Sequence, residues 1–341
     1  MKVSKIPGLG RFGVFIDDLD LNTVSDDQWM EIGKIHLESL VTIIRNVKVE
    51  PRAYELLLSK WGTPRHLSDY KLRVKYEGVE NPQIDLEDQK LIEASNHIIA
   101  SDIHPETRMI RVSGMKDEHG NAKGMFAEGE LLWHSNESGN LVFAPGVSLL
   151  GSQGVVGSST GFLTTPDWYE DQTASFQSEL DEMIVEHTFS PGKINPGLRD
   201  EQDFIMYKNM CPEPTELPLV CQSPFGIKGL HYSVNTISSI KGMSYTDSQK
   251  LFKEIDKTLF VDKYIYDHWY QQDNDLCLFD NSVTLHRRLG GIADRVCFRI
   301  QHDCRKIMKH LNLKDDRYFM EPFKSNYMSE LATINSVLDI E

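Results

Sequence analysis

The chain has 341 residues, of which 40% are hydrophobic and 26% are charged, a composition that favours a packed globular protein over a disordered one. Its net charge of −15 makes nucleic-acid phosphate and anionic lipid poor partners. No apolar run reaches the ~18 residues that a membrane-spanning helix needs, and the first residues lack the apolar stretch of a signal peptide. We therefore expect a cytoplasmic protein with no nucleic-acid or membrane partner, and we leave a homo-oligomer open.

The predicted elements are several strands, a few long helices and an irregular middle. The clearest start is the helix at Ser25, where Gln28 completes a capping box. In the N-terminal part the prediction is strand 12–21, helix 25–39, strand 41–45 and helix 51–62, followed by an irregular polar stretch 65–105. The middle part is predicted as strand 108–114, loop 116–124, strand 147–155, helix 166–184 and a proline-rich loop region 190–225. The C-terminal part is predicted as helix 246–260, strands 275–287 and 294–303, and a helical tail from Lys306.

This order predicts a mixed α+β, mainly β fold, with a double-stranded β-helix (jelly roll, cupin-like) core buttressed by helices. We expect one domain over residues 1–305 and a C-terminal helical extension over residues 306–341 packed on it. The cysteines form no Cys-x-x-Cys pair, and their odd number favours reduced thiols over disulfides or a thiolate-bound metal. They are Cys211, Cys221, Cys277, Cys297 and Cys304.

Metal-ligating side chains occur in the segment Trp133-His134-Ser135-Asn136-Glu137. In an extended strand, His134 and Asn136 would point the same way, while Ser135 and Glu137 would point to the other face. A distant histidine, His286, lies 152 residues later in a second predicted strand. Two histidines and one oxygen ligand leave three positions open on a non-haem iron. The alternative is that both histidines are ordinary hydrogen-bonded residues.

Residues 294–303 alternate between two kinds of side chain. One face carries Arg295, Cys297, Arg299 and Gln301, and the other carries Val296, Phe298 and Ile300. We expect the apolar face to pack on helices and the arginine face to point inward, where buried guanidinium groups need anions. A bound dicarboxylate would suit one of them, because guanidinium grips carboxylate with two hydrogen bonds. The alternative is an edge strand with both arginines exposed to solvent.

These blocks together resemble the taurine dioxygenase family of iron(II)/2-oxoglutarate oxygenases, over roughly residues 8–303. WHSN at 133–136 stands where the family has WH-(T/S)-D, and FDNSVTLH at 279–286 is similar to the family's W-D-N-R-x-x-x-H block. SSTGF at 158–162 is similar to the family's G-D-T-x-(W/F) segment, and two arginines four residues apart follow the distal histidine.

The resemblance implies an oxidoreductase that hydroxylates a C–H bond with O2 and releases succinate and carbon dioxide from 2-oxoglutarate. His134 and His286 would bind the iron. Thr160 and Arg295 would hold the distal carboxylate of 2-oxoglutarate. Arg299 lies where the family contacts an anionic group of the substrate.

One position departs from the family pattern, because Asn136 stands where the family has a metal-binding aspartate. Three explanations are open. Asn136 ligates as a neutral oxygen, Glu137 takes its place if a β-bulge re-aims the strand, or the position is open to a halide as in related halogenases. The strand register favours Asn136, and the bulk of asparagine argues against a halide.

The substrate side is predicted less sharply. The loops expected over the iron cover residues 66–71, 95–100, 126–132 and 229–235. Their candidate residues are His66, Tyr70, Asn96, Glu130 and His231, each of which could equally be an ordinary loop residue. We expect a small substrate that is anionic or amino-acid-like. The other readings are a catalytically degenerate member that only binds a small ligand, and a structural or interaction protein.

Overall fold

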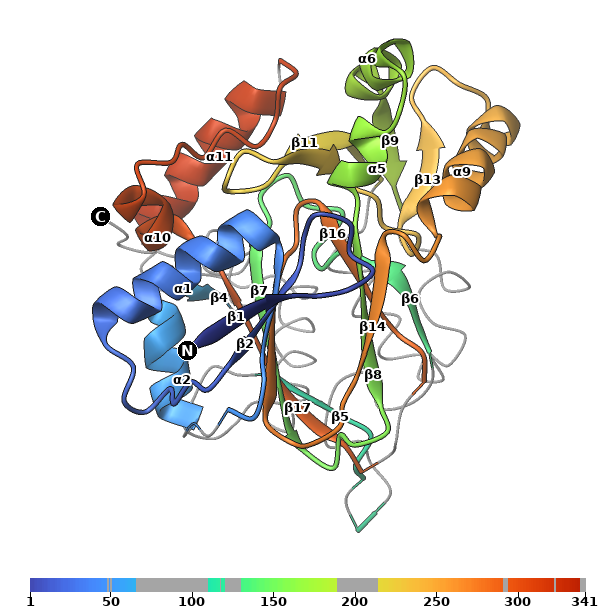
Figure 1. Ribbon diagram of the computed structural model, residues 1–341. Helices are drawn as coiled ribbons and strands as arrows, with labels where there is room; N and C mark the ends of the chain where they lie inside the picture. The colour runs from blue at the N-terminus through green and yellow to red at the C-terminus, as the bar shows by residue number, and fades with distance from the viewer. Residues whose placement is uncertain are drawn as a thin grey trace.

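Two β-sheets face each other at the centre of the molecule (Figure 1). The computed structural model describes residues 1–47, 49, 51–65, 110–116, 118–119, 130–188, 214–290, 294–321 and 323–337. The larger sheet is made of β1 (Lys2–Lys5), β2 (Val14–Asp17), β3 (Val41–Ile44), β4 (Pro64–Arg65), β5 (Ile110–Ser113), β7 (Gly146–Gln153), β15 (Asp275–Asp280) and β17 (Val296–His302). Its strand order is β1-β2-β3-β15-β7-β17-β4, with β5 also paired to β17, and only β2 and β3 run parallel.

The smaller sheet has the order β14-β8-β16-β6. Its strands are β6 (Leu131–His134), β8 (Ser159–Thr164), β14 (Ile265–Trp269) and β16 (Thr284–Arg288). The predicted mixed, mainly β jelly roll is confirmed. Within the described residues the two sheets do not join into a closed barrel, so the core is a two-layer structure with open edges.

The outer face of the larger sheet is covered by α1 (Asp26–Ser39), α2 (Pro51–Ser59) and α10 (Arg305–His310) (Figure 1). The helix start predicted at Ser25 is confirmed, since its hydroxyl accepts a hydrogen bond from the backbone N–H of Gln28. Val296, Phe298 and Ile300 of β17 pack into the same apolar cluster as these helices. The predicted outward direction of these three side chains is therefore confirmed.

The inner face of β17 points into the space between the two sheets. Cys297 packs there with Phe279 of the larger sheet and Phe162 of the smaller one. Arg295 and Arg299 on the same face are 3% and 5% exposed. The alternative of a solvent-exposed edge strand is wrong, because β17 is paired on both sides, with β7 and with β4 and β5.

The outer face of the smaller sheet is covered by a second layer of helices and short strands, which share one apolar cluster. Its helices are α5 (Pro166–Glu170), α6 (Ala174–Glu182) and α9 (Tyr245–Leu259). A three-stranded sheet in the order β10-β9-β13 and a hairpin of β11 and β12 complete this part. These strands are β9 (Ile184–His187), β10 (Thr215–Pro218), β11 (Val220–Gln222), β12 (Lys228–Leu230) and β13 (Ile237–Ile240).

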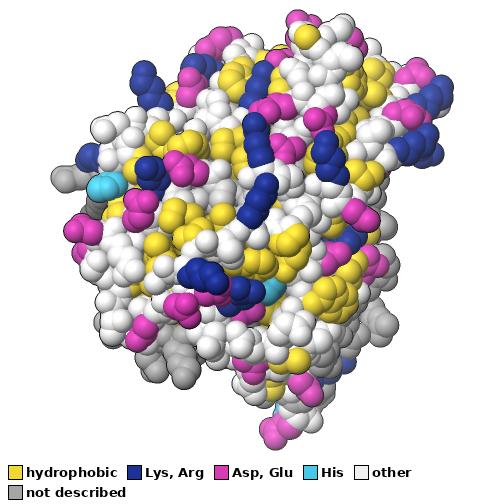
Figure 2. Space-filling model, viewed as in Figure 1, with side chains coloured by type: hydrophobic (Ala, Val, Ile, Leu, Met, Phe, Trp, Pro, Cys, Tyr) yellow, Lys and Arg dark blue, Asp and Glu magenta, His cyan; other side chains and the backbone are white. Residues whose placement is uncertain are grey.

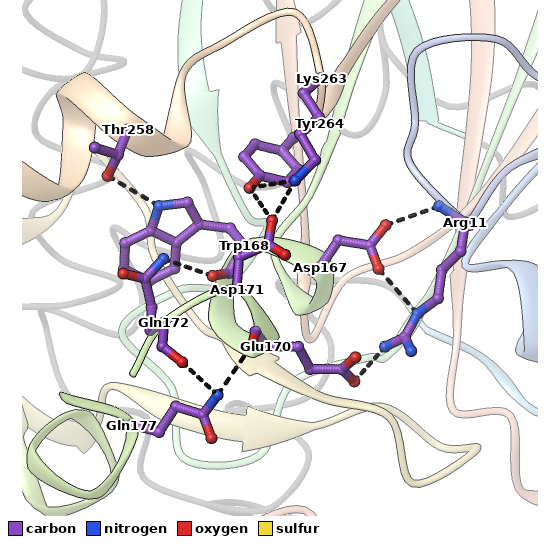
Figure 3. A network of polar contacts seen from close by, with 10 residues as sticks. All are labelled: Arg11, Asp167, Trp168, Glu170, Asp171, Gln172, Gln177, Thr258, Lys263 and Tyr264. Carbon is purple, nitrogen blue, oxygen red and sulfur yellow. Dashed lines mark hydrogen bonds and ion pairs between the residues drawn. The ribbon is translucent and has the colours of Figure 1, made fainter. Parts of the chain in front are cut away.

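The single helix predicted over residues 166–184 is wrong, because the chain forms two helices with a break between them (Figure 3). Thr173 caps α6 through its hydroxyl. The amide of Gln177 donates to the backbone carbonyls of Tyr169, Glu170 and Gln172 in the preceding segment, where α5 ends. Arg11 anchors α5 from outside through an ion pair with Asp167, with 2.9 Å between Nε and Oδ1. Local capping therefore outweighs the helical pattern of the sequence.

Two further sequence predictions need correction. The segment 275–287, predicted as one strand, turns at Asn281 and contributes β15 to the larger sheet and β16 to the smaller one. The carboxylate of Asp280 makes this corner by accepting the backbone N–H groups of Ser282 and Val283, each at 2.8 Å. The region 190–225, predicted as loop, contains β10 and β11 within its described part.

The C-terminal tail folds back over the open end of the two sheets. After α10 it runs as an extended segment and then forms α11 (Phe323–Val337). Tyr318, Tyr327 and Leu331 pack there with Val142 and Val283 in a separate apolar cluster. The tail thus contacts both the loop after β6 and the corner between β15 and β16.

None of the described helices has the length and apolar character required to cross a bilayer. Cys221, Cys277, Cys297 and Cys304 are buried free thiols. On the face drawn in Figure 2, acidic and basic side chains are interspersed rather than gathered into separate areas.

We predict that Gly33→Ala destabilises the protein, although alanine normally stabilises a helix interior relative to glycine. A Cβ atom at Gly33 would lie 2.7 Å from Nε1 of Trp61, which stacks on Trp29 with 4.2 Å between ring centroids. We expect a loss of about 1–3 kcal/mol in the free energy of unfolding from this overpacking, measured by urea denaturation. Glu38→Ala on an exposed position of α1 is the control and should change stability little.

Candidate active site

The centre of the candidate site is a pair of histidines brought together by strand pairing. In the ladder between β6 and β16, His134 lies opposite His286, and their ring centroids are 4.1 Å apart. Residues 152 positions apart in the sequence therefore become direct neighbours. Phe279 lies on the other side of His286, with 4.7 Å between ring centroids.

Both imidazole rings are held in the neutral form. Burial, with Arg299 nearby, lowers the pKa of His134 to about 4. Burial, together with His134 and Arg299, lowers the pKa of His286 well below its ordinary value. The ring of His134 donates from Nδ1 to the backbone carbonyl of Leu132 at 2.6 Å, which leaves the lone pair on Nε2. Nδ1 of His286 is buried without a hydrogen-bond partner among the described residues.

Asn136 is close to this pair, but it does not lie in a strand as predicted. β6 ends at His134, and the chain enters a turn at Asn136. The alternation expected for an extended strand is therefore wrong beyond His134. Asn136 is buried, and its side-chain oxygen accepts a hydrogen bond from Nη1 of Arg299 at 3.5 Å. Arg299 thus contacts Asn136 and also lowers the pKa of both histidines.

The turn at Asn136 is fixed by Asn281, which sits at the corner between β15 and β16. The side-chain oxygen of Asn281 accepts the backbone N–H of Asn136 at 2.8 Å. Its side-chain nitrogen donates to the carbonyls of Asn136 and Ala144 at 2.9 and 3.1 Å. Sequence analysis placed Asn281 in a family-like block but did not predict this role, because the contacts join positions 145 residues apart.

Glu137, the alternative third ligand, has its own partner in the loop. Its backbone adopts a left-handed conformation with φ of 59°. One carboxylate oxygen, Oε2, accepts the backbone N–H of Ala144 at 2.7 Å. This contact ties the Glu137 carboxylate to the far end of the loop.

The residues predicted to hold 2-oxoglutarate lie between the two sheets. Thr160 is buried on β8, and its hydroxyl is 3.1 Å from the hydroxyl of Tyr270. Arg295 is 3% exposed, and its Nη1 atom has no hydrogen-bond partner among the described residues. A buried guanidinium nitrogen without an acceptor fits a carboxylate of a bound molecule.

Arg288 adds a second buried cation near Arg295, and sequence analysis did not single it out. Its side chain is 3% exposed, and burial, with Arg295 nearby, lowers its pKa to about 10. The sequence contained one indication of this position. Side chains two residues apart in a strand point to the same side, which puts Arg288 on the same side as His286.

The predicted substrate residues are not gathered at this site by the described part of the chain. His66, Tyr70 and Asn96 lie outside the described residues. Glu130 is exposed just before β6. His231 is buried and stacks on Phe143, and its Nδ1 lies 3.2 Å from the carbonyl of Ser282.

The donor set fits a metal ion with two imidazole ligands. The two neutral rings offer nitrogen lone pairs, and the side-chain oxygen of Asn136 contacts Arg299, whose charge acts on both rings. Among the residues that the structure describes, no group of three His, Cys, Asp or Glu side chains could hold a metal. The amide oxygen of Asn136 would be a ligand of another type.

Fold and site together are those of a jelly-roll dioxygenase of the non-haem metal class. The sequence matches the model of the family described as taurine catabolism dioxygenase TauD, TfdA family over residues 3–301. The chain therefore belongs to this family of iron(II)/2-oxoglutarate-dependent dioxygenases.

Solved structures share the fold of this chain. The chain is similar to AAD-2, crystallised with Mn(II) and N-oxalylglycine, with a TM-score of 0.62, 17% identity, and 88% of this chain and 96% of that chain covered. It is similarly related to a taurine dioxygenase from Burkholderia xenovorans, with a TM-score of 0.60, 15% identity, and 96% and 97% covered. No curated protein matches the sequence.

We predict that Asn281→Asp destabilises the protein by about 2–4 kcal/mol, because two buried carbonyls lose their donor and face a carboxylate instead. The measurement is chemical denaturation of the metal-free protein. Asn326→Asp, which adds the same charge at an exposed position of α11, is the control. Equal effects of the two substitutions would contradict the role assigned to Asn281.

Proposed function

We propose that this enzyme oxidises a C–H bond of a small, carboxylate-bearing, amino-acid-like substrate. In this proposal His134, Asn136 and His286 hold iron(II), and Thr160 and Arg295 hold the distal carboxylate of 2-oxoglutarate. Arg299 binds the anionic group of the substrate. The observation that carries the proposal is the contact of two neutral imidazoles, 4.1 Å apart, beside a buried guanidinium group.

The neutral histidines are prepared for a cation without any proton having to leave. The hydrogen bond from His134 to Leu132 orients one ring and selects its tautomer. The amide of Asn136 contributes no charge, so the site has one negative charge fewer than a site with a carboxylate. We infer that the affinity of the site for iron(II) is lower as a result. We also infer that the positive charge of Arg299 is compatible with a bound metal ion only when anionic ligands bind beside it.

The second part of the proposal concerns the anions. Arg295 and Arg288 are both buried and lie near each other in space. Arg299 follows Arg295 by four residues and contacts Asn136. A keto-diacid and a substrate carboxylate would neutralise these buried charges. The chemistry supplied by iron(II) and 2-oxoglutarate when bound is oxidation of a C–H bond by dioxygen, with release of succinate and carbon dioxide.

Asn136→Asp should tighten iron(II) binding by roughly tenfold, ~1.4 kcal/mol, because a carboxylate adds a charge to the ligand set. The measurement is an anaerobic titration with iron(II) and 2-oxoglutarate, following the weak visible charge-transfer band of the chelate. Glu137→Gln is the matched control and should leave the titration unchanged. Loss of the band in Glu137→Gln with no gain in Asn136→Asp would make Glu137 the ligand, and no band in the wild-type protein would exclude the proposed function.

The substrate class can be tested through Arg299. Among small amino acids and related acids, we expect at least one to stimulate succinate release by the wild-type enzyme. Arg299→Gln should raise KM for that compound by roughly 10- to 100-fold, the effect of losing a charge-assisted hydrogen bond of about 1.5–3 kcal/mol, and Arg299→Lys should lose less. Arg45→Gln, which removes an arginine paired with Asp17 elsewhere, is the control. An unchanged KM in Arg299→Gln would exclude the proposed role of Arg299.

A further inference from the structure

The loop that follows Asn136, residues 137–144, is held by hydrogen bonds from three sources: the jelly roll, the loop itself and the C-terminal tail. From within the jelly roll, Asn281 binds the backbone of Asn136 and the carbonyl of Ala144. Glu137 closes the loop on itself through the N–H of Ala144. The position of the Asn136 side chain therefore depends on how firmly residues 137–144 are fixed.

The C-terminal tail supplies two further hydrogen bonds to this loop. The hydroxyl of Tyr318 donates to the backbone carbonyl of Leu141 at 3.0 Å. Nη1 of Arg317 donates to the backbone carbonyl of Phe143 at 2.8 Å. Both donors come from more than 170 residues further along the chain, and they satisfy carbonyls of a loop that has no sheet partner of its own.

Arg317 is itself held rigidly. It is 3% exposed, and its guanidinium lies over the ring of Phe143 at 4.1 Å and over that of Tyr327 at 5.0 Å. Its backbone carbonyl accepts the N–H of Gln222 at 3.0 Å. Burying an arginine is costly unless its contacts are well made. A guanidinium fixed between two aromatic rings therefore indicates a stable contact of the fold.

We propose that the tail segment containing Arg317 and Tyr318 positions the Asn136 loop and thereby sets the metal affinity of the site. The proposal rests on the proposed function of Asn136 as a ligand. The family match ends at residue 301, so these two positioning residues lie outside the part of the chain that the family model covers. A neutral amide binds metal more weakly than a carboxylate, and a fixed loop compensates because less freedom is lost when the metal binds.

The test compares Tyr318→Phe with Tyr327→Phe. Both substitutions remove one hydroxyl from the same apolar cluster and keep the aromatic ring, so the packing of Tyr327 on Arg317 is retained. The hydroxyl of Tyr327 donates to Asp315 at 2.7 Å, whereas that of Tyr318 donates to the loop. Mn(II) affinity in the presence of 2-oxoglutarate is measured by the electron paramagnetic resonance signal of free Mn(II). We expect Tyr318→Phe to raise the Kd by about 10-fold, the lower end of the range for groups that orient metal ligands, and Tyr327→Phe to leave it unchanged.

Two additional measurements separate positioning from general stability. Amide hydrogen exchange of residues 141–144 should become faster in Tyr318→Phe only. In an Asn136→Ala background, Tyr318→Phe should no longer change the Kd, because the loop then carries no ligand.

The outcomes distinguish this proposal from the proposed function. Equal Kd values for the wild type and Tyr318→Phe, or equal losses in Tyr318→Phe and Tyr327→Phe, would overturn the positioning role while the metal site stands. Absence of Mn(II) binding by the wild-type protein would overturn both proposals. A full effect of Tyr318→Phe in the Asn136→Ala background would show that the tail does not act through Asn136.

Discussion

The pairing of β6 with β16 is the interaction on which the rest of the site depends, because it sets His134 directly against His286. The pair sits between two sheets, where burial keeps both imidazoles neutral. The chain also buries three arginines in this interior, Arg299, Arg295 and Arg288. Buried guanidinium groups suit an enzyme that takes a keto-diacid as cosubstrate, because guanidinium binds carboxylate with two hydrogen bonds.

Asn136 changes the balance of forces within this family framework. A carboxylate at this position would pair with Arg299 and bind the metal through charge, whereas an amide has to rely on placement. Two sets of hydrogen bonds fix the backbone around Asn136. Asn281 holds the turn from the corner between β15 and β16, and the C-terminal tail holds the following loop. In the proposed site, a neutral ligand of lower affinity and a firmly held loop would be two aspects of one arrangement.

Much of this could be predicted from the sequence where the determining interactions are local or periodic. The helix start at Ser25 follows from capping, and the two faces of β17 follow from strict alternation. The same reasoning failed for Asn136, because the chain leaves the strand at His134 under the influence of Asn281, far away in sequence. It also missed the break before Thr173 and the corner at Asn281, where side-chain hydrogen bonds to the backbone overrule the apparent continuity of helix and strand.

The separation of the two histidines along the chain has a consequence for how the enzyme matures. The ribosome adds 151 residues between His134 and His286, and the ladder that joins them forms within the smaller sheet only when β6 and β16 have both been made. Pairing between strands so far apart in the sequence is slow to form, so the two imidazoles are not held together in a partly folded chain. A cation that needs both rings, as in the proposed site, would be acquired by the finished fold and would stabilise the native state alone by mass action.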